Sequence, residues 1–264
     1  MSLPPILHED DVLIAFDKPG GLPVVPARRG KSQPSLMALV HDQFGPSVAN
    51  VHRLDDDTSG VLLCAKTKPA LDYLSGQFQG KTAAKTYHAL VVVLQPEEVM
   101  LTSAPAPVRT PEGTVPEAFT LELPLDDDEL SPGRMRLAKK RGGRPAVTEI
   151  CTLERFGRFA WVECRPLTGR THQVRLHLAA AGLPVLNDPI YGVPGIELRL
   201  SDLKRRYKGR EDEQPLLRRF ALHASGLTLK HPATGAPVTI TAPLPHEFEV
   251  ALKYLRKFAT GAKL

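Results

Sequence analysis

The sequence predicts an α+β fold with a mixed, largely antiparallel central sheet flanked by helices and loops. Residues 146–156 and 159–167 are β-rich segments joined by a short turn, which is the pattern of a hairpin. Residues 34–45 and the segment after Pro245 carry apolar side chains at helical spacing. Because strands and helices are mixed along the chain rather than strictly alternating, antiparallel pairing is favoured.

The first half of the chain predicts strands around one amphipathic helix. Residues 11–19 form a short apolar run closed by a proline, and the glycines and prolines of 19–26 predict a loop after it. The helix at 34–45 has a proline near its start and Gly45 at its stop. The remaining elements expected here are a buried strand at 60–66, a short helix at 71–79 and a strand at 85–94.

The second half predicts a further hairpin and two helices. Residues 95–133 are rich in Pro, Asp and Glu with weak periodicity, so they predict loops and irregular strands. Residues 171–182 predict a helix with Thr171 as N-cap and Gly182 as its stop. The last expected elements are a hairpin of 226–231 and 237–242, and a closing helix with an apolar stripe of Phe248, Leu252, Leu255 and Phe258.

The composition is that of an ordinary globular protein. The 264 residues suffice for one large domain or two small ones, and 42% hydrophobic with 24% charged residues excludes a disordered or fibrous chain. The net charge of +5 favours a polyanionic partner only if the basic residues cluster. They do so at 136–144 and 203–210, which can lie along a phosphate backbone or be solvated loops, and Tyr207 in the second segment could stack on a base.

The cysteines and the N-terminus indicate a compartment. Cys64, Cys151 and Cys164 include no CxxC pair, which predicts buried thiols in a reducing environment and argues against a disulfide framework or a zinc site. The N-terminus lacks a signal-peptide pattern, and the longest apolar run, 89–94, is too short to span a bilayer. We therefore expect a cytoplasmic protein without a membrane partner.

Residues 51–60, VHRLDDDTSG, place three carboxylates in a row between a helix and an apolar strand. An aspartate can act as a covalent nucleophile if an arginine keeps its carboxylate ionised and aimed, and such a pair lowers an Asp pKa by about 1 to 3 units. Arg53 and Arg175 are candidate partners, and Thr58, Ser59 and Gly60 could fix the turn by short side-chain to backbone hydrogen bonds. A plain polar turn stays an equal alternative on this motif alone.

Two other readings of these residues are weaker. DDDTS is similar to the loop of magnesium-dependent aspartyl phosphatases, but Ser59 stands where Thr or Val belongs and the apolar strand follows the acids instead of preceding them. His172 and His177 lie five residues apart on a predicted helix, which turns them further from each other than the four-residue spacing of a zinc helix. We expect no metal site.

Several motifs together resemble the RluA-type pseudouridine synthases, which isomerise uridine to pseudouridine in structured RNA. HRLD, two variable residues and TSG occupy 52–60, and K-x-Y-x-A occupies 85–89. GRTHQ-hydrophobic-R-x-H occupies 169–177 and is continued by GLPVLNDPIYG, and LHA and HP-x-TG follow at 222–224 and 231–235. KPGGLPV near the N-terminus is also similar to the family's pattern. The resemblance runs from about residue 6 to 250 and implies the pseudouridine synthase fold with a central active-site cleft.

The resemblance implies a role for each matched position. Asp55 is the expected catalytic nucleophile, and its two acidic neighbours fall at variable positions. Arg175 is expected to pair with that aspartate, Tyr87 to stack on the target base and assist removal of the C5 proton, and Arg53 to fill the gap left by the extruded nucleotide. The further residues expected to bind substrate are His52, Lys85, Arg170, His172 and Gln173. The family chemistry uses no cofactor and no metal.

The resemblance also sets the expected organisation and partners. A single catalytic domain over 1–264 is expected, without the family's S4-type RNA-binding module, acting as a monomer on an rRNA or tRNA loop. Asp56 stands where relatives often carry a basic residue, Asn187 where glycine is common, and the long charged connection 193–219 could shape substrate choice. The alternative function is a non-catalytic RNA-binding or chaperone protein that kept the fold.

Overall fold

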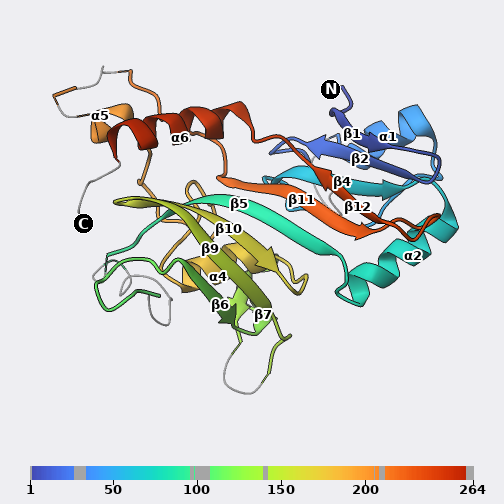
Figure 1. Ribbon diagram of the computed structural model, residues 1–264, viewed down its shortest axis with the longest axis horizontal. Coiled ribbons are helices and arrows are strands. Elements are labelled where there is room, and N and C mark those ends of the chain that lie inside the picture. The colour runs from blue at the N-terminus through green and yellow to red at the C-terminus, as the bar shows by residue number, and fades with distance from the viewer. Residues whose placement is uncertain are drawn as a thin grey trace. The chain divides into compact units, whose positions relative to one another are not determined.

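The computed structural model describes residues 2–26, 34–95, 98, 108–138, 142–204, 206–207 and 212–259 (Figure 1). The chain divides into two compact units, one of Met1–Tyr87 with His223–Pro243 and the other of His88–Leu222 with Leu244–Leu264. Both predicted basic segments, 136–144 and 203–210, lie partly outside the described residues.

The described part of the first unit is a mixed sheet with helices α1 and α2. Its strands run in the order β1, β2, β4, β11, with β12 beside β11 and β3 beside β4. Every pairing is antiparallel except that of β4 with β11, which is parallel. The strands are β1 (Ile6–Glu9), β2 (Leu13–Lys18), β3 (Ala49–Asn50), β4 (Ser59–Ala65), β11 (Leu222–Lys230) and β12 (Pro237–Thr241), and the helices are α1 (Leu36–Phe44) and α2 (Lys68–Gln79).

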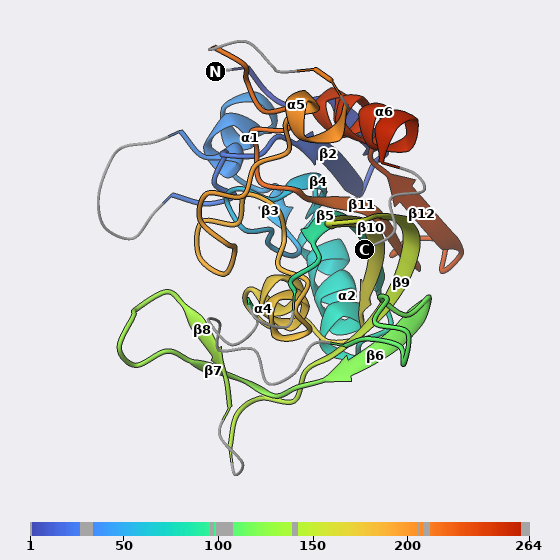
Figure 2. The ribbon, with the colours of Figure 1, turned by 90° about the vertical axis from the view of Figure 1, so that its left-hand side faces the viewer.

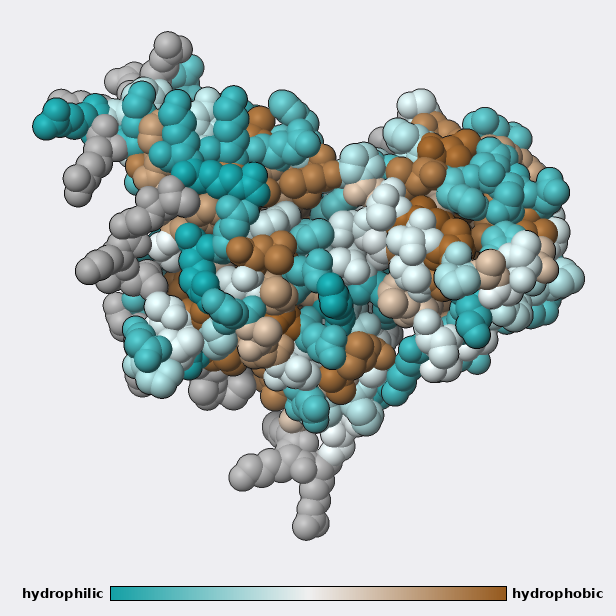
Figure 3. Space-filling view, in the orientation of Figure 1, coloured by the Kyte–Doolittle hydropathy of each residue, from teal (hydrophilic) through white to brown (hydrophobic). Residues whose placement is uncertain are grey.

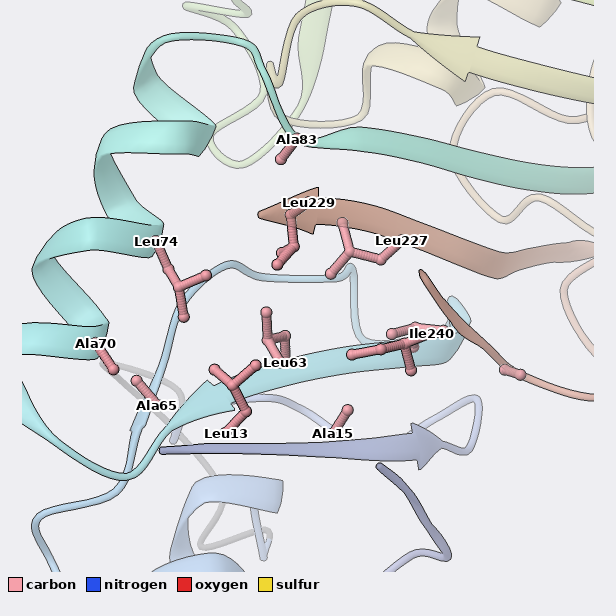
Figure 4. Packing of buried hydrophobic residues seen from close by; sticks show 12 residues of the cluster. Leu13, Ala15, Leu63, Ala65, Ala70, Leu74, Ala83, Leu227, Leu229 and Ile240 are labelled. Carbon is pink, nitrogen blue, oxygen red and sulfur yellow. The ribbon is translucent and has the colours of Figure 1, made fainter. Parts of the chain in front are cut away.

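Strand β4 is buried along its whole length because both faces of the sheet are covered. On one face Leu63 lies between Leu74 of α2 and Leu229 of β11 (Figure 4), and Val61 belongs to the same cluster. On the opposite face Leu62 and Cys64 belong to a cluster with the buried side of α1. This two-sided burial explains why residues 61–65 form an uninterrupted apolar run, and the strand predicted at 60–66 is confirmed as Ser59–Ala65.

Among the residues that the structure describes, the second unit contains the predicted long hairpin together with helices α4, α5 and α6. Its main strands run in the order β5, β10, β9, β6, and a separate hairpin joins β7 to β8. The strands are β5 (Ala84–Val92, whose first residues belong to the first unit), β6 (Ala118–Glu122), β7 (Leu125–Asp127), β8 (Met135–Leu137), β9 (Val147–Phe156) and β10 (Phe159–Pro166), and the helices are α4 (Gln173–Ala180), α5 (Leu200–Leu203) and α6 (His246–Phe258).

Helix α6 buries the predicted apolar stripe. Phe248, Leu252 and Leu255 are buried, Phe258 is half-buried, and the Phe248 ring meets Trp161 of β10 edge-on with centroids 5.8 Å apart. Helix α4 packs against β8, β9 and β10.

The structure differs from the expected elements at several ends. Strand β1 was not predicted, because Ile6–Glu9 pairs at a sheet edge without regular burial. Helix α2 begins at Lys68 rather than 71, since Thr67 caps it by accepting a hydrogen bond from the Ala70 N–H and a proline fits its first turn. The prediction of buried thiols is wrong for Cys151, which the alternation of β9 places on the exposed face.

Candidate functional site

The acidic motif forms a tight turn between the first helix and β4. The Thr58 N–H donates to the Asp55 carbonyl at 3.1 Å, which closes the turn. Thr58 and Ser59 are buried, Asp55 is half-buried, and Arg53 is exposed. Asp55 is therefore held by the backbone of a turn whose C-terminal end is fixed in the core.

Ser59 makes a different contact from the one predicted. Its hydroxyl bonds to Nδ1 of the buried His223 on β11 at 2.8 Å, instead of to nearby backbone. Beside it, Gly60 has φ 113°, and a Cβ there would lie 2.1 Å from the Ala224 carbonyl oxygen. Glycine is required at this position because the parallel pairing of β4 with β11 brings the two backbones together. The TSG sequence thus docks the turn onto β11.

A buried lysine that was not predicted as a site residue holds the same turn. Lys18, at the end of β2, is fully buried, and its Nζ donates to the carbonyls of Asp56 at 2.7 Å, Leu22 at 2.7 Å and Pro19 at 3.0 Å. The Gly21 N–H also donates to the Asp56 carbonyl at 2.9 Å. Hydrogen bonds therefore connect the Gly- and Pro-rich loop to the acidic turn at Asp56, the residue next to Asp55.

Replacing Lys18 by methionine is expected to loosen this turn. The variant keeps the length of the side chain but leaves three carbonyls without their charged donor, which we expect to cost about 2 to 3 kcal/mol in the free energy of unfolding. Denaturant unfolding monitored by circular dichroism measures that loss. Lys68→Met, which removes an exposed lysine that pairs with Asp72, is the control and should change stability by less than about 0.5 kcal/mol. An unfolding free energy of Lys18→Met equal to the wild type contradicts the assigned role.

His52 and Lys85 form a desolvated pair of basic groups in the first unit. The His52 ring stacks on Phe78 with centroids 5.0 Å apart, and its Nε2 accepts the Leu63 N–H at 3.1 Å. Burial, together with the positive charge of Lys85, lowers the pKa of His52 to about 4, so this imidazole is neutral at pH 7. Burial lowers the pKa of Lys85 to about 8. His52 is thus a neutral group that accepts a backbone hydrogen bond, whereas Lys85 is charged at neutral pH and loses its proton as the pH rises through about 8.

Tyr87 and Asp55 act on each other electrostatically. The Tyr87 ring packs against the apolar cluster that includes Leu54 and Ala224. Burial, and next the negative charge of Asp55, raise the pKa of the Tyr87 phenol well above its ordinary value. A phenol in this environment stays protonated at neutral pH. The first unit therefore brings the predicted nucleophile and the predicted tyrosine to one place.

In the second unit, Arg175 is held by a carboxylate that was not predicted as a site residue. Its Nε donates to Oδ2 of Asp188 at 2.9 Å and a terminal nitrogen donates to Oδ1 at 2.7 Å. Both side chains are buried, with exposed fractions of 3% and 0%. The guanidinium also lies 5.4 Å from the Tyr191 ring centroid and 4.9 Å from that of Phe220. A bidentate, buried pair of this kind fixes the plane and direction of the guanidinium.

Tyr191 connects this pair to the β7–β8 hairpin and to His172. Its hydroxyl donates to the Met135 carbonyl at 3.1 Å, accepts the Met135 N–H at 2.8 Å, and lies 3.0 Å from Nδ1 of His172. Asp188 in turn accepts the Tyr191 N–H at 3.0 Å. Asp188 and Tyr191 come from GLPVLNDPIYG, a stretch quoted for the family resemblance without a role.

Helix α4 begins in a way that the sequence did not predict. The expected N-cap Thr171 is wrong, because His172 is the N-cap and has φ 52°, without a side-chain capping hydrogen bond. A left-handed residue here reverses the chain sharply, and the Gln173 side chain stabilises the reversal. Its amide oxygen accepts the Arg170 N–H at 3.1 Å and the Thr168 hydroxyl at 2.7 Å. The predicted stop is confirmed, since Gly182 follows the last turn with φ 70°.

The other motif residues have internal partners as well. The Gln173 amide nitrogen donates to the Val147 carbonyl at 2.9 Å, and the Gln173 side chain is buried. Arg170 is half-buried and its Nε donates to the Pro145 carbonyl at 3.1 Å. Asn187 has φ 60°, a left-handed conformation that glycine and asparagine adopt more readily than other residues, and its amide donates to the carbonyls of Leu217 and Arg219.

The candidate site residues thus fall into two groups. The first unit carries His52, Arg53, Asp55, Lys85 and Tyr87, and the second carries Arg170, His172, Gln173 and Arg175. Lys18, Asp188 and Tyr191 are the additional residues that the structure joins to these groups. A lysine at the end of an apolar strand, before glycines and prolines, is the one sequence signal that could have indicated Lys18.

No group of three or more metal-ligating side chains comes together within the described part of the chain, and His177 Nε2 bonds to the Leu123 carbonyl at 2.9 Å. None of the described helices is both long and apolar enough to cross a bilayer.

Comparisons with known proteins place the chain in a family. The family described as RNA pseudouridylate synthase matches residues 12–180. A ribosomal large subunit pseudouridine synthase D of Neisseria meningitidis serogroup B is 34% identical over 258 residues, which cover 95% of this chain and 61% of that protein. A protein of the same name from Xanthomonas campestris is 33% identical, with 97% and 71% covered. The chain thus spans about three fifths of the length of the Neisseria relative.

Solved structures agree with the sequence relatives. Human RNA Pseudouridylate Synthase Domain Containing 4 is 25% identical with a TM-score of 0.67, covering 95% of this chain and 92% of that one. Human RNA Pseudouridylate Synthase Domain Containing 1 shares the fold, with a TM-score of 0.62 at 24% identity over 91% of this chain and 83% of that one. The predicted pseudouridine synthase fold is confirmed. By its sequence motifs, its matched family and its fold, this chain belongs to the RNA pseudouridylate synthase family.

Proposed function

We propose that this protein isomerises uridine to pseudouridine in structured RNA, with RNA of the large ribosomal subunit as the first candidate substrate. Family membership supports the reaction, and the printed names of the relatives from Neisseria and Xanthomonas support the substrate. The observation that carries the proposal is the turn that holds Asp55: the Thr58 N–H closes it, Lys18 binds it, and its Leu54 packs in the same apolar cluster as the Tyr87 ring. A tRNA loop is the second candidate substrate. We further propose a single catalytic domain that acts as a monomer in the cytoplasm.

Asp55 is the proposed catalytic residue. The target uridine leaves its stack so that C1′ becomes accessible, at a cost of a few kcal/mol. Asp55 then promotes cleavage of the N1–C1′ bond, by attack on C1′ or by assisting elimination to a glycal. The uracil turns, and C5 bonds to C1′ while the Asp55–C1′ bond breaks or, on the glycal route, while the proton removed from C2′ is returned. The C5 proton then leaves and N1 gains a proton. All atoms balance without an external reagent. The turn closed between Asp55 and Thr58 keeps the carboxylate aimed throughout.

Tyr87 is proposed to hold the uracil and to assist loss of the C5 proton. Its ring lies in the same first unit as Asp55, and its raised pKa keeps the phenol neutral. A neutral phenol accepts a proton only while it gives up its own, and Asp55 is the base coupled to it. We infer that the two groups act together in this step.

Arg175 is proposed to keep Asp55 ionised, the pairing expected from the resemblance. The two residues belong to different units, and the support is that Asp188 and Tyr191 hold the guanidinium in a fixed direction. Gln173, whose amide bonds to Val147 and Arg170, acts in this proposal as a positioning residue for the start of α4. His172 and Arg170 remain proposed RNA contacts.

Arg53 and Lys85 are proposed to contact the RNA from the first unit. Arg53 is exposed, so its guanidinium can occupy the space left by the extruded nucleotide. Lys85 is charged below pH 8 and would bind a phosphate.

RNA affinity is expected to fall as the pH rises through about 8. The free Lys85 ammonium has a lowered pKa of about 8, and binding to phosphate favours its charged form, so protonation supports binding below that pH and is lost above it. We expect about tenfold weaker binding at about pH 9 than at about pH 7. Fluorescence anisotropy with a uridine-free RNA measures this. Lys85→Arg, whose charge does not titrate in this range, should bind equally at both pH values. The same decline in that variant contradicts the role of Lys85.

The alternative function is a non-catalytic RNA-binding or chaperone protein. One experiment separates the proposals: the purified protein is incubated with protein-free large-subunit rRNA and, separately, with tRNA, in the presence of EDTA, and pseudouridines are mapped at single-nucleotide resolution. New pseudouridine at a discrete site supports the synthase and identifies its substrate. RNA binding without any new pseudouridine supports the alternative. A magnesium-dependent phosphatase would instead release phosphate from a phosphate ester, and EDTA would abolish that release.

A further inference from the structure

Cations and aromatic rings gather where α5 and the end of α6 lie side by side in the second unit (Figures 1 and 2). Hydrophilic side chains cover the solvent-facing side of α6 (Figure 3). The three lysines of this region are exposed and its three rings are half-buried. We name it the α5–α6 surface, made of Lys204, Tyr207, Lys253, Tyr254, Lys257 and Phe258.

The rings and ammonium groups of this surface are in mutual contact. Lys204 Nζ lies 5.6 Å from the centroid of Tyr207 and 5.8 Å from that of Phe258, and Lys257 Nζ lies 5.3 Å from Phe258. Tyr254 and Phe258 stack with centroids 6.1 Å apart and ring planes inclined by 11°. Ring faces bordered by cations are the arrangement that binds bases and phosphates of single-stranded nucleic acid.

The arginines near this surface are paired with carboxylates, whereas its lysines are not paired with any carboxylate among the described residues. Arg256 binds Glu154 with contacts of 2.6 and 2.9 Å, and Arg199 binds Glu197, so both arginines are neutralised. No salt bridge joins Lys204, Lys253 or Lys257 to a carboxylate among the residues that the structure describes. Complementing the dipole of α6 accounts for Lys257 in the last turn, but Lys253 lies more than one turn earlier and the rings have no part in that effect.

A hollow of about 670 Å³ adjoins the α5–α6 surface. Phe258 lines it from the surface itself, Asp202 and Leu203 line it from α5, and Phe156, Arg158 and Phe159 line it from the β9–β10 turn. Its volume is in the range of cavities that enclose small organic ligands, which is enough for an unpaired base with its ribose.

We propose that the α5–α6 surface binds a single-stranded stretch of the RNA substrate, with phosphates on the lysines and an unpaired base on the rings or in the hollow. The inference rests on the proposed function for the identity of the RNA, and it adds a contact region made of none of the candidate catalytic residues. Part of the basic segment singled out in the sequence, Lys204 and Tyr207, thereby acquires a role.

The first test removes charge. Binding of a fluorescent oligocytidylate of about 15 nucleotides, which contains no uridine, is measured against salt concentration. For Lys253→Gln/Lys257→Gln we expect the slope of log affinity against log salt to become shallower by about 1.4, because two phosphate contacts are lost. The control Lys68→Gln/Lys230→Gln removes two exposed charges from the first unit and should keep the wild-type slope. Equal slopes in the wild type and both variants overturn the inference.

The second test removes a ring. Tyr207→Ala is expected to weaken binding of the same oligonucleotide by about fivefold or more, since base stacking on an aromatic side chain has at least that effect. Thermal unfolding verifies that the variant is folded, and ultraviolet cross-linking of wild-type protein should recover peptides with Tyr207, Tyr254 or Phe258. Unchanged affinity in a folded variant overturns the stacking role.

Pseudouridine formation by the wild type tests the proposed function, and RNA affinity of the α5–α6 variants tests this inference. If the wild type forms no pseudouridine but the α5–α6 variants lose affinity, the isomerase proposal fails and this inference stands. If the wild type forms pseudouridine and the variants bind normally, the reverse holds.

Discussion

Asp55→Ala is expected to abolish pseudouridine formation while RNA affinity stays within about twofold of the wild type. The carboxylate is the group that acts at C1′, and loss of a nucleophile typically lowers the rate by about 10⁴-fold or more. Because the turn is closed by backbone and by Lys18, removing the side chain should leave the fold intact. Single-turnover conversion of the mapped rRNA site measures the rate, and anisotropy measures the affinity.

The neighbouring carboxylates are the matched controls for this prediction. Asp56→Ala and Asp57→Ala remove one negative charge each from the same turn, and Asp56 is exposed. Both should retain activity within a few-fold of the wild type, since they stand at variable positions of the motif. Conversion by Asp55→Ala at a rate similar to that of either control would rule out Asp55 as the nucleophile.

Asp188→Asn is expected to destabilise the second unit and to lower activity. Removing one partner of a buried ion pair costs about 3 to 5 kcal/mol, and Arg175 and Asp188 are both almost fully buried. For a protein of this size the loss corresponds to a fall in Tm of roughly 10 °C. The amide also loses acceptor strength toward the N–H groups of Ile190 and Tyr191. Differential scanning calorimetry measures the change.

A double-mutant cycle separates the pair from general damage. In Arg175→Met/Asp188→Asn the buried positive charge is gone, so the double variant should be more stable than Asp188→Asn alone, although inactive if Arg175 supports Asp55. Arg136→Gln, which removes a half-buried arginine that pairs with the more exposed Asp126 and Glu129, is the control and should shift Tm by about 2 °C or less. If Asp188→Asn unfolds at the wild-type temperature, the bidentate pair is not what holds Arg175.

Much of the fold could be predicted from local pattern. The hairpin of β9 and β10, the strand β4 and the closing helix follow from periodicity and turn residues, which depend on neighbours within a few positions. The start of α4 is less predictable, because the left-handed conformation of His172 goes with a tertiary contact to Tyr191. The start of α2 at Lys68 follows from local signals, since Thr67 caps the Ala70 N–H and a proline occupies the first turn.

Most residues that support the site cannot be identified from the sequence. Lys18 reads as an ordinary charged residue at a strand end, and its role appears only when the Asp56 carbonyl, 38 positions away, lies within hydrogen-bond distance. Asp188 likewise reads as part of a loop until it meets Arg175. Cys151 was misplaced because the face of a strand depends on which side is covered.

The sequence by itself determined the family, the order of the elements and the identity of the acid proposed for catalysis, because motifs and periodicity are encoded in short stretches. The tertiary structure alone decided what surrounds that acid and its proposed partners. The buried Lys18 ammonium binds three carbonyls, including that of Asp56. Tyr87 is desolvated near the carboxylate of Asp55, and Asp188 binds the guanidinium of Arg175. Burial and long-range approach create these environments, and neither is a property of neighbouring residues in the chain.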